Sequence, residues 1–181
     1  MTRRLPLAPI AALALAVAAL PALAASESAV LGMMKAPVAA DATLGSLIGS
    51  WRGAGRIRRG SDGVAEATQC RFTNTWTADK RLARLLLACR GTDLVFTADG
   101  YVGRDGGTYR GAWSTTTGEN ATISGRKSGS GLRLTVAPSG GSRPPGSLSL
   151  RVAGRSVTAR LTVKDSDTGK TYTAFETTLR R

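Results

Sequence analysis

The chain contains two cysteines, Cys70 and Cys89, and they lie symmetrically about the dipeptide Asp79-Lys80. If the chain folds back on itself through a two-residue turn at this dipeptide, Cys70 falls directly opposite Cys89. The same register creates three further opposed pairs: Phe72 with Leu87, Asn74 with Leu85, and Trp76 with Ala83. The turn, the cysteines and the apolar face agree on one register, which predicts a β-hairpin clamped by a disulfide. The alternative is a pair of free, buried thiols.

Residues 1–24 have the pattern of a secretory signal peptide. Arg3 and Arg4 supply a positive region, residues 10–20 are apolar, and Ala22-Leu23-Ala24 matches a cleavage site with small residues. The alternative is a membrane anchor, but the apolar run is short against the roughly 20 residues needed to span a bilayer. We therefore expect a bacterial protein that is periplasmic or secreted and does not span the membrane. Export to an oxidising compartment also favours the disulfide.

Composition argues against most catalytic chemistries. The chain has no histidine, which removes histidine triads, histidine acid–base catalysis and histidine metal sites. A Cys70–Cys89 bridge would also remove thiolate ligands and nucleophiles. The few carboxylates lie mostly near turns, and no pair is marked as the acid and base of a hydrolase. We expect no enzymatic activity, no metal and no cofactor.

Beyond the signal, the sequence predicts a short leader and one domain. Residues 25–40 are rich in alanine and are interpreted as a flexible leader, and residues 41–181 as a single domain. Residues 41–48 suit a short helix with Asp41 as its N-cap. After this helix, apolar and polar residues alternate through about eight to ten short segments separated by turn residues. Sequential hairpins of this kind favour an all-β, antiparallel up-and-down barrel, and a two-sheet sandwich is the alternative.

The tripeptide Gly49-Ser50-Trp51 opens the first strand directly after the expected helical turn. This arrangement resembles the Gly-x-Trp signature of the lipocalin and wider calycin group. In that group a basic side chain near the end of the chain packs over the tryptophan, and Arg180 or Arg181 occupies the corresponding place here. The resemblance implies a barrel that holds a small ligand. The group also includes periplasmic inhibitors of secreted metalloproteases, which have one disulfide and a free N-terminal segment.

Several aromatic and apolar residues are expected to face the interior of the barrel. They could line a ligand cavity, or they could fill the interior, since small barrels do either. The candidates for a cavity lining are Trp51, Phe72, Trp76, Leu85, Leu87, Tyr109 and Trp113.

Arginines dominate the charge pattern, and the chain carries a net charge of +13. Arg52, Arg56, Arg58 and Arg59 are expected to form a basic stripe on the outer face of the first strand. Such a stripe could attract an anionic envelope surface, or it could be a solvated face without a partner. Nucleic acid is not expected as a partner, because an exported chain with few exposed aromatic residues offers little for bases to stack on.

The function that these patterns favour is non-enzymatic. We expect a monomeric barrel that binds a small apolar or amphipathic ligand or an envelope component. The alternative is a protein-binding module that resembles a periplasmic protease inhibitor and acts through residues 25–40.

Overall fold

The structure is a computed structural model that describes residues 25–141 and 143–181. The predicted signal peptide, residues 1–24, lies outside the described residues. The elements in chain order are α1 (Glu27–Gly32), β1 (Pro37–Val38), α2 (Ala42–Leu47), β2 (Gly49–Ile57), β3 (Glu66–Trp76), β4 (Leu82–Arg90), β5 (Val95–Asp105), β6 (Thr108–Thr115), β7 (Asn120–Ser128), β8 (Gly131–Pro138), β9 (Gly146–Ala153), β10 (Ser156–Lys164) and β11 (Thr171–Arg180).

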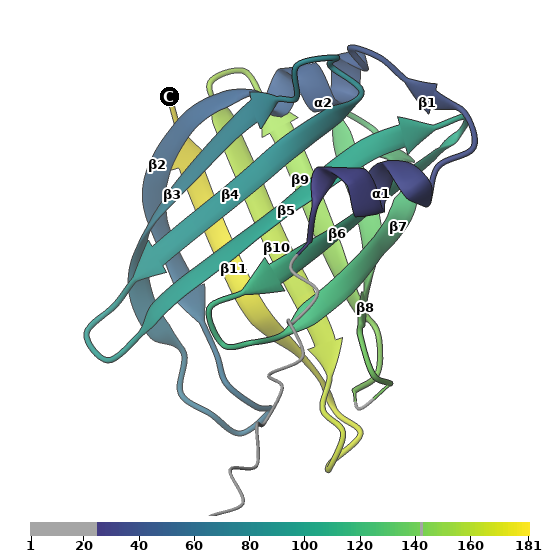
Figure 1. The fold of residues 1–181 in the computed structure, drawn as a ribbon. Helices are drawn as coiled ribbons and strands as arrows, with labels where there is room; N and C mark the ends of the chain where they lie inside the picture. The colour runs from purple at the N-terminus through teal and green to yellow at the C-terminus, as the bar shows by residue number, and fades with distance from the viewer. Residues whose placement is uncertain (1–24, 142) are drawn as a thin grey trace, which may run out of the picture.

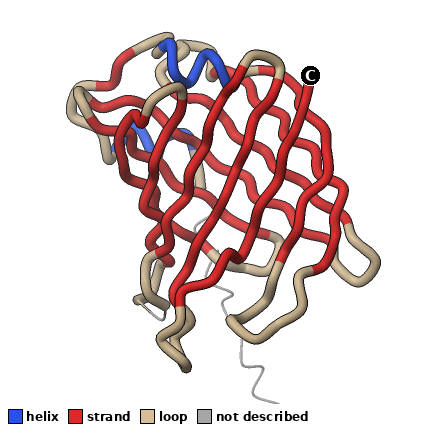
Figure 2. The backbone as a smooth tube through the Cα atoms, turned by 180° about the vertical axis from the view of Figure 1, so that it is seen from behind, coloured by secondary structure: helices blue, strands red, loops and turns tan. Residues whose placement is uncertain are grey.

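Strands β2 to β11 form a closed barrel, which is visible from both sides in Figures 1 and 2. Each strand pairs antiparallel with the next strand along the chain, and β11 returns to pair with β2. This last ladder runs from Phe175 opposite Ile57 to Arg180 opposite Arg52. Because it leaves no open edge between the first and last barrel strands, the up-and-down barrel is confirmed over the sandwich.

The hairpin of β3 and β4 has the predicted register. Cys70 lies opposite Cys89, and the other three predicted pairs are also opposed. The turn is wider than the two residues expected, because Thr77 N donates to Leu82 O at 2.9 Å and encloses residues 78–81. Asp79 holds this turn together by accepting hydrogen bonds from the backbone N–H of Arg81 and the hydroxyl of Thr77. The Arg81 side chain also donates to Asp79 through Nε. The backbone bond first, then the bonds from the Arg81 side chain and Thr77, lower the pKa of Asp79 to about 2.

Helix α2 closes one end of the barrel, at the top of Figure 1. Asp41 is its N-cap, as predicted, and accepts a hydrogen bond from Leu44 N at 3.0 Å. Leu44 and Leu47 point from the helix into the barrel and are fully buried, as is Trp51 at the start of β2. This end of the barrel is therefore filled by side chains.

Residues 25–40, which the sequence predicts to be a flexible leader, lie against the barrel in the structure. Helix α1 lies across the outside of β5 and β6, and its Val30 is fully buried. The carboxylate of Asp105 accepts hydrogen bonds from Lys35 N and Ala36 N, and β1 pairs with the end of β5. The alanine-rich composition gave no sign of this docking, because it depends on contacts with β5 and β6.

Glycines on the inner face allow neighbouring strands to approach closely. A Cβ atom at Gly53 would lie 2.2 Å from Thr178 O, and one at Gly111 would lie 2.2 Å from Tyr101 O. These glycines therefore permit the strong coiling that a closed barrel needs. They do not leave room for a ligand.

Candidate functional site

The end of the barrel opposite α2 contains a cavity of about 550 Å³. Its walls are the inward side chains at the far ends of the strands, where no helix fills the interior. Their apolar members include Ile57, Phe96, Trp113, Leu161 and Phe175. Four of these five are only half-buried, although alternation along their strands directs them inward. The cavity thus exposes apolar surface inside the barrel, at a size typical of small-molecule sites.

Hydrogen bonds between two loops shape the mouth of the cavity. The carboxylate of Asp165 accepts bonds from Ser61 N, on the β2–β3 loop, and from Thr168 N and Asp167 N, on the β10–β11 loop. These backbone bonds lower the pKa of Asp165 well below its usual range. Nearby, Gly60 N donates to the hydroxyl of Tyr172 at 3.1 Å. The two loops are therefore fixed to one another at the rim.

The rim carries more positive than negative groups. Arg58, Arg59 and Lys164 line the mouth and make no ion pair with any other residue that the structure describes. Glu119 is paired with Arg143, and the charge of Asp165 is held by backbone N–H groups. An apolar interior beneath three unpaired cations suits a molecule with one apolar and one polar end.

The closed end holds a dense polar cluster around Trp51. The indole Nε1 donates to Leu47 O at 2.8 Å, and the Asn74 amide donates to the same carbonyl at 2.9 Å. The Arg181 guanidinium stacks 4.0 Å from the centroid of the Trp51 ring and donates to Ile48 O. The stacked residue is thus Arg181, whereas Arg180 lies exposed on the outer face of β11. The cluster ties the C-terminal end of the last strand to the start of the first.

Asp41 connects α2 to two further strands. Its carboxylate is buried and accepts hydrogen bonds from the Tyr109 hydroxyl at 2.9 Å and from Arg104 Nη1 at 3.2 Å. Burial raises the pKa of Asp41, but the bonds from Leu44 N, Tyr109 and Arg104, with the charge of Arg104, outweigh it and lower the pKa below 3.8. Burial also raises the pKa of Tyr109. Asp41 thus stays ionised and holds α2 against β5 and β6.

The structure divides the seven predicted cavity residues into two groups. Trp113 lines the cavity. Trp51, Phe72 and Tyr109 are buried in the packed core, and the remaining three are half-buried against that core: Trp76, Leu85 and Leu87. Leu161 belongs to the wider set of residues expected to face inward, whereas Phe96 and Phe175 were not proposed as cavity residues. Their position at strand ends far from the expected helix 41–48 could have identified them.

The four arginines of the predicted basic stripe lie in two different places in the structure. Arg52 and Arg56 are exposed on the outer face of β2, whereas Arg58 and Arg59 follow the strand and line the cavity mouth.

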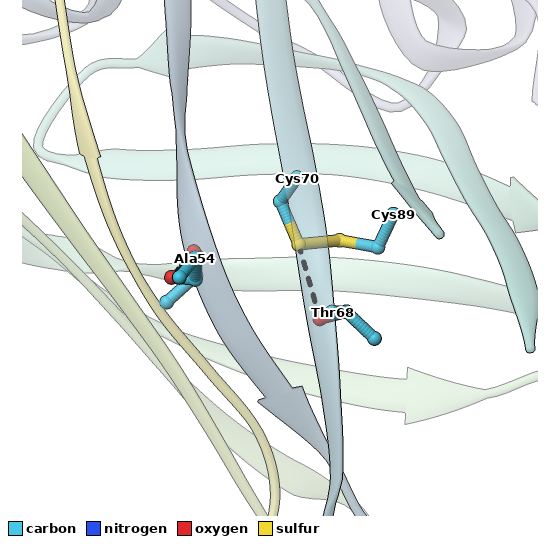
Figure 3. Close-up of a disulfide and its surroundings, with 5 residues drawn as sticks. Ala54, Thr68, Cys70 and Cys89 are labelled. Carbon is cyan, nitrogen blue, oxygen red and sulfur yellow. Dashed lines mark hydrogen bonds between the residues drawn. A yellow bond between two sulfur atoms is a disulfide. The ribbon is translucent and has the colours of Figure 1, made fainter. Parts of the chain in front are cut away.

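The cysteines form the predicted disulfide, which crosses between β3 and β4 as shown in Figure 3. Both cysteines are buried, and the Thr68 hydroxyl lies 3.5 Å from Cys70 Sγ.

Neither a metal-binding cluster nor a membrane-spanning helix is found among the described residues. In residues 25–141 and 143–181, no group of three His, Cys, Asp or Glu side chains is placed to bind a metal ion. None of the helices in these ranges has the length and apolarity needed to cross a bilayer.

A closed antiparallel barrel of ten strands, plugged by a short helix at one end and open at the other, fits a calycin-like barrel at a coarse level. No family model and no curated protein sequence matches the chain. Among solved structures, the crystal structure of Rv2717c from M. tuberculosis matches with a TM-score of 0.65 and 15% sequence identity. The match covers 77% of this chain and 95% of that chain, and at this identity it shows a shared fold.

Proposed function

We propose that this protein is a non-enzymatic barrel that binds a small apolar or amphipathic molecule in the cavity at its open end. The observation that carries the proposal is the cavity itself, about 550 Å³ lined by half-buried apolar side chains. Apolar surface left exposed to water inside a barrel is unfavourable, and a ligand that covers it gains the corresponding hydrophobic free energy.

The mouth favours an amphipathic ligand whose polar end stays at the rim. Arg58, Arg59 and Lys164 line the entrance, and a charge placed instead against the apolar part of the wall would lose its hydration without gaining a charged partner. A ligand with its apolar part beside Trp113 and Phe96 and its polar part at the rim satisfies both conditions.

The absence of catalysis is also part of the proposal. Histidine is missing from the sequence, and both cysteines are held in the disulfide. The two carboxylates at the mouth have other partners, since Glu119 pairs with Arg143 and Asp165 accepts backbone N–H groups. A periplasmic or secreted location is proposed from the signal-like residues 1–24 and from the disulfide, which favours an oxidising compartment.

The inhibitor-like alternative depended on a free N-terminal segment. Residues 25–40 instead pack on the barrel through α1 and β1, with Val30 fully buried. A segment held in this way would have to detach before it could enter a protease cleft. The ligand-binding proposal needs no such step and is preferred.

The test uses N-phenyl-1-naphthylamine, an uncharged apolar fluorophore that accepts energy from tryptophan. We expect the protein to bind it and to show energy transfer from Trp113, the tryptophan that lines the cavity. Trp113→Phe should keep binding but reduce the transfer, because Trp51 and Trp76 lie at the α2 end of the barrel, farther from the cavity.

A matched pair of substitutions locates the site. Ala121→Phe adds a bulky side chain to the cavity wall, whereas Ala54→Phe adds the same group on the exposed outer face of β2. Both variants are first checked for cooperative unfolding. Ala121→Phe should weaken fluorophore binding, and Ala54→Phe should not. Equal binding by both variants would contradict a site in this cavity.

A further inference from the structure

A second hollow lies on the outside of the barrel, across β2, β3, β4 and β5, and has a volume of about 380 Å³. Alternation along the strands directs its polar lining residues outward, away from the ligand cavity. They are Arg52, Gln69, Arg71, Arg90 and Thr97, and no carboxylate belongs to the lining. We call this hollow the arginine groove.

The arginine groove places positive charges directly beside one another. Arg52 lies opposite Arg71 on β3 and opposite Arg180 on β11, so that three arginines form a row across three adjacent strands. Opposed residues in a sheet have Cβ atoms about 4.5–5.5 Å apart, and like charges on directly opposed residues are unfavourable. The lining of the groove itself holds three guanidiniums, those of Arg52, Arg71 and, from β4, Arg90.

These arginines have no anionic partner in the described part of the chain. Arg52, Arg71, Arg90 and Arg180 are all exposed and take part in none of the ion pairs or side-chain hydrogen bonds found there. The neighbouring Arg56, by contrast, has an acidic residue opposite it on β11, Glu176. The row and the groove therefore hold positive charge that no carboxylate of the described residues compensates.

We infer that the arginine groove is a binding site for a phosphate group carried by a partly apolar molecule. Three guanidiniums give the site a charge that a phosphate monoester or diphosphate balances better than a singly charged carboxylate does. The planar guanidinium also matches phosphate oxygens in a two-point geometry. Val95, which is 63% exposed at the edge of the groove, offers an apolar surface to the remainder of the molecule.

The disulfide supports the groove from below. Arg71 directly follows Cys70, and Arg90 directly follows Cys89, so that the bridge fixes the spacing of the two strands that carry these arginines. The backbone from which these side chains extend is therefore already ordered before a ligand binds, and its ordering costs nothing on binding. The concave shape favours a single phosphate-bearing molecule over a flat bilayer surface.

The test measures binding of inorganic pyrophosphate to the full mature chain by isothermal titration calorimetry at low salt. Arg52→Gln/Arg71→Gln removes two opposed charges from the groove. The control is Arg126→Gln/Arg133→Gln, which removes another pair of opposed, exposed arginines on β7 and β8, outside the groove. Both double variants lose the same net charge, so that a difference between them reports the groove.

We expect the groove variant to bind pyrophosphate at least about tenfold more weakly than the parent, and the control variant to bind within about twofold. The groove variant should also unfold at the same temperature or higher, because it relieves cross-strand repulsion. Equal weakening in both variants, or absence of pyrophosphate binding by the parent, would overturn the inference. So would retention on phosphatidylglycerol vesicles without pyrophosphate binding, since this result would assign the arginines to a membrane surface.

Discussion

Substitution of Asp41 by alanine should destabilise the barrel by removing the acceptor that holds α2. The carboxylate caps α2 through Leu44 N and accepts the hydroxyl of the buried Tyr109. Loss of an N-cap costs about 1 kcal/mol, and a buried donor left without a partner costs about 1–3 kcal/mol. The Arg104 pair adds little, because the arginine side chain is 43% exposed. We therefore expect the free energy of unfolding to fall by about 2–4 kcal/mol.

The measurement is urea denaturation at pH 7, followed by circular dichroism. Asp41→Asn is the matched variant, because asparagine is also a good N-cap and its amide oxygen can still accept the bond from Tyr109. It should lose much less stability than Asp41→Ala. In a Tyr109→Phe background no buried hydroxyl is left unpaired, so Asp41→Ala should cost less there than in the parent.

The pH dependence provides an independent check. The folded pKa of Asp41 lies below the ordinary value of 3.8, so ionised Asp41 contributes stability above pH 3.8. This contribution is lost as the pH falls through the folded pKa. The stability gap between the parent and Asp41→Asn should therefore close as the pH is lowered from 4 toward the folded pKa. Equal losses for Asp41→Ala and Asp41→Asn at pH 7, or a gap that persists in acid, would refute this account of the network.

Two further predictions concern the disulfide of the β3–β4 hairpin and the last residue of the sequence, Arg181. Cys70→Ser should lower the free energy of unfolding by about 3 kcal/mol, because the bridge spans 19 residues of chain and restricts the unfolded state; equal thermal stability of the parent with and without reductant would contradict this. Arg181→Ala should lower stability by about 1–2 kcal/mol and change the fluorescence of Trp51, through loss of the stacked guanidinium. Arg180→Ala, which removes an exposed charge, is the control and should do neither.

The sequence predicts the β3–β4 register correctly because two independent constraints coincide. The turn at Asp79-Lys80 and the alternation that includes Phe72 and Leu87 would both be violated by a slip of one residue. The N-cap at Asp41 was also predictable, since capping depends on residues adjacent in sequence. In both cases local pattern and tertiary structure impose the same arrangement.

Features that depend on distant strands were not predictable in this way. The arginine stripe was expected along β2, but the row in the structure runs across β11, β2 and β3 and depends on their registers. The docking of Val30 likewise depends on β5 and β6. The assignment to Arg181 follows from alternation once Leu179 is known to face inward, because Arg180 then faces outward and the following residue can turn over Trp51.

The two ends of the barrel differ in a way that bears on the proposed function. At the α2 end, Leu44, Leu47 and Trp51 are fully buried, and the polar groups around them contribute hydrogen bonds to that end. At the other end, the same alternation directs apolar side chains inward, yet Trp113 and Leu161 stay half-exposed around a cavity. Filling that volume would bury more apolar surface and raise stability. The barrel is therefore less stable than it would be with both ends filled. The proposed ligand binding gives a physical reason for this lower stability, because a site for a ligand needs unfilled volume.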